Sequence, residues 1–273
     1  MKKINEIKNA HEKRIANFRY YLDYFNKREL IMSLSDFDNC LKIWNIEFVC
    51  LISIKNVNIV GFLYSACFLQ NSNDIFIITS NYTYGGVSEY IKAFDLNGKL
   101  KKEINYSNKK TNFIDSYYDK KSSKNYIITG NDNCAFSYDF DNNIKYKKYF
   151  DKNYDEFKNA HISLIINDLE EKIKLIDSCF DGNIRIWNFH TGDLLDKIHV
   201  DDIRLYGICL WNKNYLFVGS DNLKLIDLSN GITIGCFQGH CGPVQTIKKI
   251  FHPKYGECLI SKSSDIKLWK NED

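Results

Sequence analysis

The chain has 273 residues, of which 44% are hydrophobic and 26% are charged, so it is long enough for a globular fold with a sizeable core. Its net charge of +3 is too small to argue for nucleic-acid binding by itself. The N-terminus lacks the apolar segment of a secretory signal, and no apolar run approaches the roughly 18 residues that cross a bilayer. The nine cysteines are scattered without a CxxC pair. We therefore expect an intracellular protein, cytoplasmic or nuclear, without a membrane span, a metal or a cofactor.

A six-fold repeat runs through the sequence. Each copy has a turn, a short alternation of apolar and polar residues, and a large side chain at the end of the alternation: Trp44, Phe94, Tyr138, Trp187, Ile226 and Trp269. These positions recur every 39 to 50 residues, a period that is typical of four-stranded propeller blades and too long for ankyrin or tetratricopeptide units. The alternation and the abundance of Ile, Phe, Tyr and Val predict strands rather than helices.

Each repeat is predicted to hold four short strands, here called a, b, c and d in chain order. Strand c ends at the large side chain of the repeat. Strands b precede strands c, at residues 29–35, 74–80, 125–130, 173–179, 215–220 and 257–263. Strands a come before them, as at 62–69, 161–167 and 205–211, and strands d follow strands c, as at 99–105 and 144–150. The sequence therefore predicts an all-β fold, a single β-propeller with six blades of four antiparallel strands.

At these residues the sequence resembles the WD-repeat β-propellers. In that family a Gly-His pair precedes strand a, an Asp occupies the b–c turn, and strand c ends in Trp-Asp. The matching residues are Gly239, His240, Asp38, Asp181, Trp44, Trp187 and Trp269, with "NAH" at His11 and His161 in place of Gly-His. The sequence departs from the family because Trp-Asp never occurs and because Phe94, Tyr138 and Ile226 replace the Trp in three repeats.

The resemblance implies a structural role for the His, Asp and Trp of each repeat. In the family the His before strand a, the Asp of the b–c turn and the strand-c Trp form a hydrogen-bonded cluster inside the blade. Three repeats here can build it: His11/Asp38/Trp44, His161/Asp181/Trp187 and His240/Asp265/Trp269. The Asp would hold the imidazole in one tautomer, and a buried Trp N–H needs a partner. We expect these residues to be structural and not catalytic.

The two ends of the chain suggest how the propeller closes. The last repeat supplies strand c but no strand d, and residues 1–8 precede the first strand a without a place in any repeat. We expect residues 1–8 to pair beside residues 265–270 and close the last blade. Residues 1–273 would then form one WD-repeat domain of six blades. A seven-bladed ring completed by another chain or by lost sequence is the alternative.

No pattern in the sequence indicates an enzyme. A Walker loop, GxGxxG, HExxH and GxSxG are all absent from it. The histidines outside the repeat clusters, His190, His199 and His252, are isolated from one another in the sequence. We expect no catalytic residue.

Lysines gather between residues 99 and 152, where twelve Lys accompany six Asp and one Glu for a net charge of +5. A basic lobe of this kind could bind RNA or anionic lipid. Many of these lysines fall on predicted outer strands d, where lysine protects a sheet edge from aggregation. We therefore keep binding of RNA or anionic lipid as the alternative function and do not favour a nucleic-acid partner.

The d–a and b–c loops share one rim of a propeller, the face on which the family usually binds peptides. The b–c connection of the second repeat is expanded at residues 80–90 and contains Tyr82 and Tyr84, and Phe37 and Phe180 precede the turn aspartates of two others. Exposed aromatic residues are typical interface anchors, although these rings could instead fold back on a neighbouring blade. The sequence thus predicts a non-catalytic scaffold that binds other proteins or peptides through this rim, as a monomer or in a larger complex.

Overall fold

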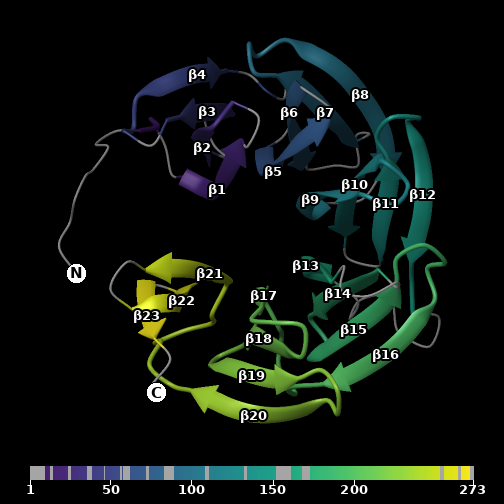
Figure 1. The fold of residues 1–273 in the computed structure, drawn as a ribbon, viewed down its shortest axis with the longest axis vertical. Coiled ribbons are helices and arrows are strands. Elements are labelled where there is room, and N and C mark those ends of the chain that lie inside the picture. The colour runs from purple at the N-terminus through teal and green to yellow at the C-terminus, as the bar shows by residue number, and fades with distance from the viewer. Residues whose placement is uncertain are drawn as a thin grey trace. The chain divides into compact units, whose positions relative to one another are not determined.

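The computed structural model describes residues 10–12, 15–23, 26–35, 39–45, 47–55, 57, 62–71, 74–82, 89–107, 111–131, 134–151, 161–167, 173–252, 255–263 and 266–270. For some strand residues, including Tyr82 and His161, it describes only the backbone. Within these ranges the chain forms strands and no helix, and the strands make six small antiparallel sheets (Figure 1). The chain is therefore an all-β, six-bladed β-propeller, which confirms the fold class predicted from the sequence.

The chain divides into two compact units. The first holds residues 1–129 and 137–146, and the second holds residues 130–136 and 147–273. The third sheet contributes residues to both units.

The first three sheets each contain four strands that follow one another in the chain. The first sheet is β1 (Ile15–Asp23), β2 (Arg28–Ser35), β3 (Cys40–Trp44) and β4 (Cys50–Ile54). The second is β5 (Phe62–Asn71), β6 (Asp74–Tyr82), β7 (Glu89–Asp95) and β8 (Leu100–Ser107). The third is β9 (Thr111–Asp119), β10 (Lys124–Asn131), β11 (Ala135–Asp139) and β12 (Ile144–Tyr149).

The last three sheets follow the same order. The fourth is β13 (His161–Asn167), β14 (Lys174–Cys179), β15 (Asn183–Asn188) and β16 (Leu194–His199). The fifth is β17 (Ile208–Leu210), β18 (Tyr215–Gly219), β19 (Leu223–Asp227) and β20 (Ile232–Phe237). The sixth has three strands among the described residues, β21 (Thr246–His252), β22 (Gly256–Lys262) and β23 (Ile266–Lys270). The strand predicted for residues 1–8 lies outside those residues.

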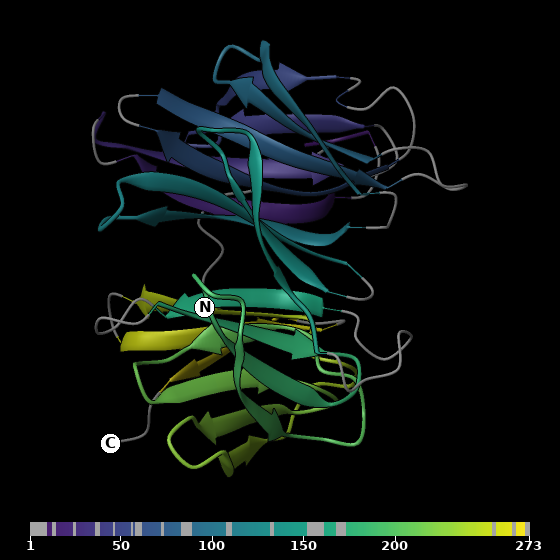
Figure 2. The ribbon, with the colours of Figure 1, turned by 90° about the vertical axis from the view of Figure 1, so that its right-hand side faces the viewer.

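The apolar side of each sheet packs on the next sheet of its unit. On β3, Leu41 and Ile43 are fully buried and join a core with Phe68 and Phe94 of the second sheet. In the second unit, Ile186 of β15 packs in the same way with residues of the fifth sheet. Full burial of one such side chain contributes about 1.5–3 kcal/mol. The alternation of the strands thus produces sheets that pack face to face (Figure 2).

The first strands of neighbouring sheets contact one another. In the first unit β5 contacts both β1 and β9, and in the second unit β17 contacts both β13 and β21 (Figure 1). Within each unit, strands a of successive sheets therefore lie side by side. In the first unit this brings the C-terminal ends of β1, β5 and β9 together, where a pocket forms.

Candidate functional site

In the first sheet the Ser33 hydroxyl lies between the predicted His11 and Trp44 and contacts both of them. The His11 imidazole Nε2 lies 2.8 Å from the Ser33 hydroxyl oxygen, and the indole N–H of Trp44 donates to the same oxygen at 2.8 Å. All three residues are buried. Asp38, the third residue predicted for this cluster, lies outside the described residues.

The sixth sheet repeats this arrangement. His240 Nε2 lies 2.6 Å from the Ser261 hydroxyl oxygen, and the Trp269 N–H donates to that oxygen at 2.7 Å. Gly239 precedes the histidine with a φ of 147°, a conformation that favours glycine and accounts for the Gly-His pair. Asp265 lies outside the part of the chain that the structure describes.

The fourth sheet has an aspartate where the other two have serine. The Trp187 N–H donates to Asp177 Oδ2 at 2.9 Å, and both side chains are fully buried. His161 begins β13, but its side chain is outside the described set. In this sheet the polar cluster is ionic.

Arg185 stands at the centre of the ionic cluster and is fully buried. Its guanidinium donates to Asp181 at 2.7 and 3.3 Å and to Asp151 at 3.3 Å. Lys197 also reaches Asp151, at 3.4 Å. Burial opposes the charge of Arg185, but the hydrogen bonds that it donates to Asp181 and the negative charges around it, including Asp177, raise its pKa above the ordinary value. Asp181 is therefore bound to an arginine within its own sheet.

The thiol beside this cluster is not a nucleophile at neutral pH. Cys179 is fully buried and donates to Asp177 at 3.5 Å. Burial and the neighbouring Asp177 raise the pKa of Cys179 well above its usual range. A thiol with a raised pKa stays protonated and unreactive.

Sequence reasoning missed the central residue of each cluster. Ser33, Asp177 and Ser261 all lie on strand b, two residues after the residue that pairs with the Trp of strand c. That offset places the hydroxyl or carboxylate on the same side of the sheet as the indole. A small polar residue at one fixed place in otherwise apolar strands b was the signal in the sequence.

A second repeated residue is the cation two positions before the large side chain of strand c (Trp44, Phe94, Trp187 or Ile226). Lys42 donates to the Ala10 carbonyl at 2.6 Å, Lys92 to the Val57 carbonyl at 3.3 Å, and Lys224 to the Val200 carbonyl at 3.1 Å. These three carbonyls all precede a strand a, and Arg185 reaches Asp151 in the corresponding connection. The cations therefore bind the segments that precede strands a, and we interpret their role as structural.

Of the four aromatic residues predicted for the rim, the structure describes the side chain of one, Phe180. Phe180 is partly exposed in the turn after β14, with the Arg204 guanidinium 4.7 Å from its ring centre and the Tyr206 ring 6.2 Å away. Tyr82 ends β6 and is described by its backbone only. Phe37 and Tyr84 lie outside the described residues, so the rim stays a prediction.

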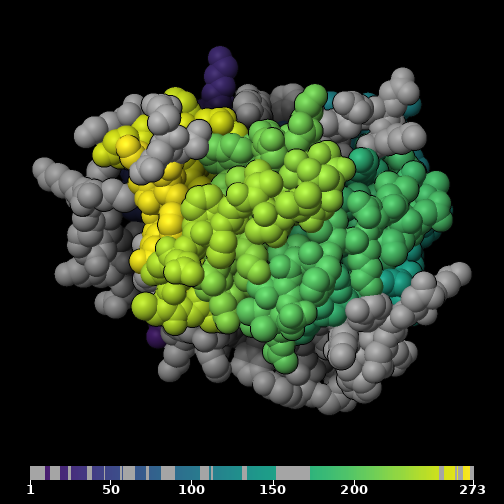
Figure 3. Space-filling model, turned by 90° about the horizontal axis from the view of Figure 1, so that it is seen from below, coloured from purple at the N-terminus to yellow at the C-terminus, as the bar shows by residue number. Residues whose placement is uncertain are grey.

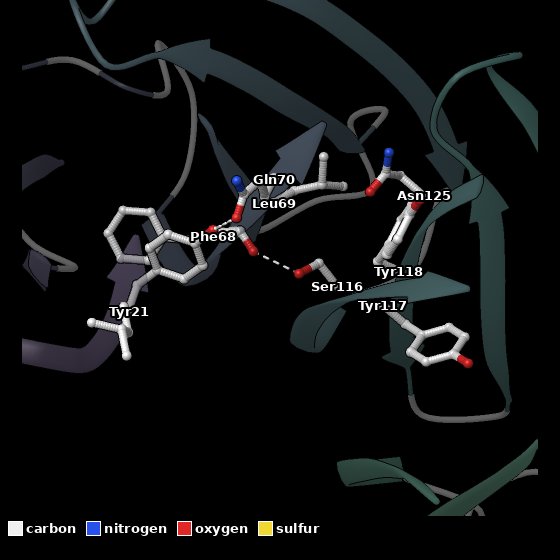
Figure 4. A pocket seen from close by; sticks show the side chains of 9 residues that line it. Tyr21, Phe68, Leu69, Gln70, Ser116, Tyr117, Tyr118 and Asn125 are labelled. Carbon is white, nitrogen blue, oxygen red and sulfur yellow. Dashed lines mark hydrogen bonds between the residues drawn. The ribbon is translucent and has the colours of Figure 1, made fainter. Parts of the chain in front are cut away.

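A pocket of about 230 Å³ opens in the first unit, at the ends of three strands a (Figure 4). Its lining is Tyr21, Leu22, Phe68, Leu69, Gln70, Ser116, Tyr117, Tyr118 and Asn125, none of which is charged. These side chains come from β1, β5, β9 and β10. The sequence analysis did not find this site, because strands separated by some 50 residues each supply only two or three of its residues.

Hydrogen bonds hold one wall of the pocket. The Tyr21 hydroxyl donates to Gln70 Oε1, the Tyr21 ring stacks on Phe68 with centroids 5.0 Å apart, and Ser116 donates to the Phe68 carbonyl at 2.6 Å (Figure 4). Burial, and then the nearby Asp23 carboxylate, raise the pKa of Tyr21 to about 12, so its hydroxyl stays a donor at neutral pH. The buried Gln70 Nε2 has no hydrogen-bond partner among the described residues.

The pocket lies away from the predicted rim. Its residues occupy the C-terminal ends of β1, β5 and β9, where each chain turns into strand b. The d–a connections enter the same strands at the opposite end. The aromatic residues of this pocket therefore lie at the a–b end of the first unit.

Several lysines of the predicted basic lobe have partners inside the protein. Lys101 pairs with Asp95 at 3.2 Å and Lys124 with Asp139 at 2.9 Å. Lys102 donates to the Phe140 carbonyl, and the Lys148 ammonium lies 4.4 Å from the Phe150 ring centre. These contacts favour the interpretation of the lysines as stabilisers of outer strands.

Neither a scan against models of protein families nor a search of curated proteins found a match to this chain. Among the described residues no group of three or more His, Cys, Asp and Glu is placed to hold a metal ion. Nor does that part of the chain contain a helix of the length and apolarity that crossing a bilayer requires.

Proposed function

We propose that this protein is a non-catalytic WD-repeat scaffold that binds other proteins or peptides. One observation supports it above the others. The polar side chains of the repeat are bound to each other inside the sheets, whereas the pocket is uncharged and lined by aromatic rings. Such a surface suits an apolar or aromatic side chain of a partner, because aromatic contacts dominate the energy of protein interfaces.

The proposal that the repeats are of the WD type is supported by the polar residues that the first and sixth sheets share. A His before strand a, the strand-c Trp and the serine between them occur in both the first and the sixth sheets, and in the sixth the His is preceded by Gly239. We further propose that residues 1–273 form one domain closed by residues 1–8, and that the protein is intracellular. Six of the nine cysteines are buried and none of the nine forms a disulfide, which suits a reducing compartment.

Two surfaces are candidates for the partner. The first is the rim of b–c and d–a loops, with Phe37, Tyr82, Tyr84 and Phe180 as anchors. The second is the pocket, with Tyr117 and Tyr118 at its β9 wall; Tyr118 is 48% exposed. Alanine at an exposed anchor should cost about 2 kcal/mol or more of binding and little stability.

Affinity capture from the source cell, followed by mass spectrometry, tests the proposal with four proteins. They are the wild type, Phe37→Ala/Phe180→Ala, Tyr117→Ala/Tyr118→Ala, and Lys147→Glu/Lys148→Glu. The scaffold proposal expects a protein partner that one aromatic variant loses and that the lysine variant retains.

Loss of the captured partner in the lysine variant alone would refute the scaffold proposal and favour the basic lobe. In that case binding of RNA or of anionic vesicles should weaken steeply as the salt concentration rises, because each phosphate contact releases counterions. Melting curves of all four proteins would show that each variant is folded.

A further inference from the structure

The outer strand of the fifth sheet lacks the charges that protect other outer strands. Residues 228–247 contain no Asp, Glu, Lys or Arg, and β20 (Ile232–Phe237) lies within this stretch. By contrast, β8 carries two lysines and a glutamate, and β12 carries three lysines. β4 is uncharged too, but Glu47 and Lys55 stand close to its ends. An uncharged outer strand is open to pairing with another strand.

The backbone of β20 has one open side. The strand order of the sheet is β17-β18-β19-β20, so among the described residues β20 pairs with β19 along one side only. Only another extended strand can match the regular row of N–H and C=O groups on the other side. The geometry of the site therefore selects a β-strand as its occupant.

The side chains of β20 add an apolar surface to this open side. Ile232 is 58% exposed and Ile234 is 51% exposed. Gly231, which directly precedes β20, lies against Ile198 of β16. The two strands are neighbours on the surface, in green and yellow-green in Figure 3. Ile232 and Ile234 are two residues apart and so share one face of β20, where they form an exposed apolar pair that suits an interaction surface.

We propose that β20 pairs in antiparallel fashion with β20 of a second copy of this chain. A two-fold axis pairs residue i of one strand with residue j of the other and j with i, so a strand that carries several lysines places lysines near the lysines of its copy. β20 has no charge to repel, and Ile232, Thr233 and Ile234 are β-branched residues that favour cross-strand pairs. The second copy thus offers the uncharged, apolar strand that the open side requires.

The pairing should be weak and should stop at the dimer. Six residues of strand per copy are far fewer than the roughly 20–30 residues a side of a standard interface, so we expect a dissociation constant above about 1 µM. Because the same patch is used on both copies, the contact closes with two-fold symmetry.

Sedimentation velocity at rising protein concentration tests this proposal on three proteins. The wild type should shift from monomer to dimer, and Ile234→Lys should remain a monomer across the same range. The control Ile144→Lys changes the same residue type on β12, the outer strand of the third sheet, where Ile144 is 60% exposed. It should dimerise like the wild type, and unchanged melting curves should show that both variants are folded.

A wild type that stays monomeric up to about 0.5 mM, well above the dissociation constant expected for so small an interface, would overturn the proposal. So would a dimer that survives Ile234→Lys, since the contact would then lie elsewhere, for example at β4. Assemblies that grow beyond two copies would also overturn it, because a closed two-fold contact cannot extend. The proposal is independent of the scaffold function, whose partner capture does not involve β20.

Discussion

Replacing Arg185 by Met should destabilise the protein by about 3–5 kcal/mol, because it leaves buried carboxylates without their cation. The guanidinium is fully buried, and its partners Asp181 and Asp151 expose only 2% and 5% of their side chains. Asp151 would keep Lys197 at 3.4 Å, so most of the loss should come from Asp181. Urea unfolding followed by circular dichroism would measure the change, and the melting temperature should fall by roughly 6–20 °C.

Two further variants isolate the cause of this loss. Lys224 occupies the equivalent position in the fifth sheet and pairs with a partly exposed Asp201, so Lys224→Met should cost only about 1 kcal/mol. The double variant Arg185→Met/Asp181→Asn should recover at least half of the stability, because it removes the stranded charge. Equal losses in Arg185→Met and Lys224→Met, or no recovery in the double variant, would refute the reasoning.

Ser33→Ala should cost about 1–3 kcal/mol in urea unfolding, because the Trp44 N–H loses its buried acceptor; a smaller loss would mean that the indole finds another partner. Burial opposes ionisation of Asp139, but hydrogen bonds from Asn142 and Lys124 lower its pKa, so its stabilisation is complete above the unfolded pKa of about 4 and disappears as the pH falls through the lower folded value. The stability gap between wild type and Asp139→Asn should accordingly shrink in unfolding curves below about pH 4; a constant gap would exclude this carboxylate as the cause. Deleting residues 1–8 should lower the melting temperature by many degrees if they close the last blade, whereas an unchanged curve would exclude that closure.

The fold could be predicted from the sequence because each repeat carries its own local pattern. Trp44, Trp187 and Trp269 mark the ends of strands c, and the apolar alternation before them fixes which side of each strand is buried. These signals lie within a few residues of one another, so they can be recognised in the sequence without knowledge of the tertiary structure.

The centres of the polar clusters and the pocket could not be predicted in the same way. Ser33 and Trp44 are eleven residues apart, and only the pairing of Ile31 with Trp44 places them on one side of the sheet. The pocket combines side chains of β1, β5 and β9, and each of its aromatic residues has the sequence signature of an ordinary core residue. Contacts between strands, and not patterns along one strand, create both features.

The cations of strand c have a consequence for how unfolding spreads along the chain. Val57 donates its N–H to the Asn39 carbonyl of the first sheet and accepts from Lys92 of the second, so one residue is fastened to both of its neighbours. In a linear array of repeats, links of this kind raise the nearest-neighbour energy and make adjacent repeats melt together. At the third sheet the equivalent position is Phe136, which cannot form the link, and that sheet is the one divided between the two compact units. The third sheet thus lacks a link that other sheets have, so we expect the cooperativity of unfolding between neighbouring repeats to be weakest there.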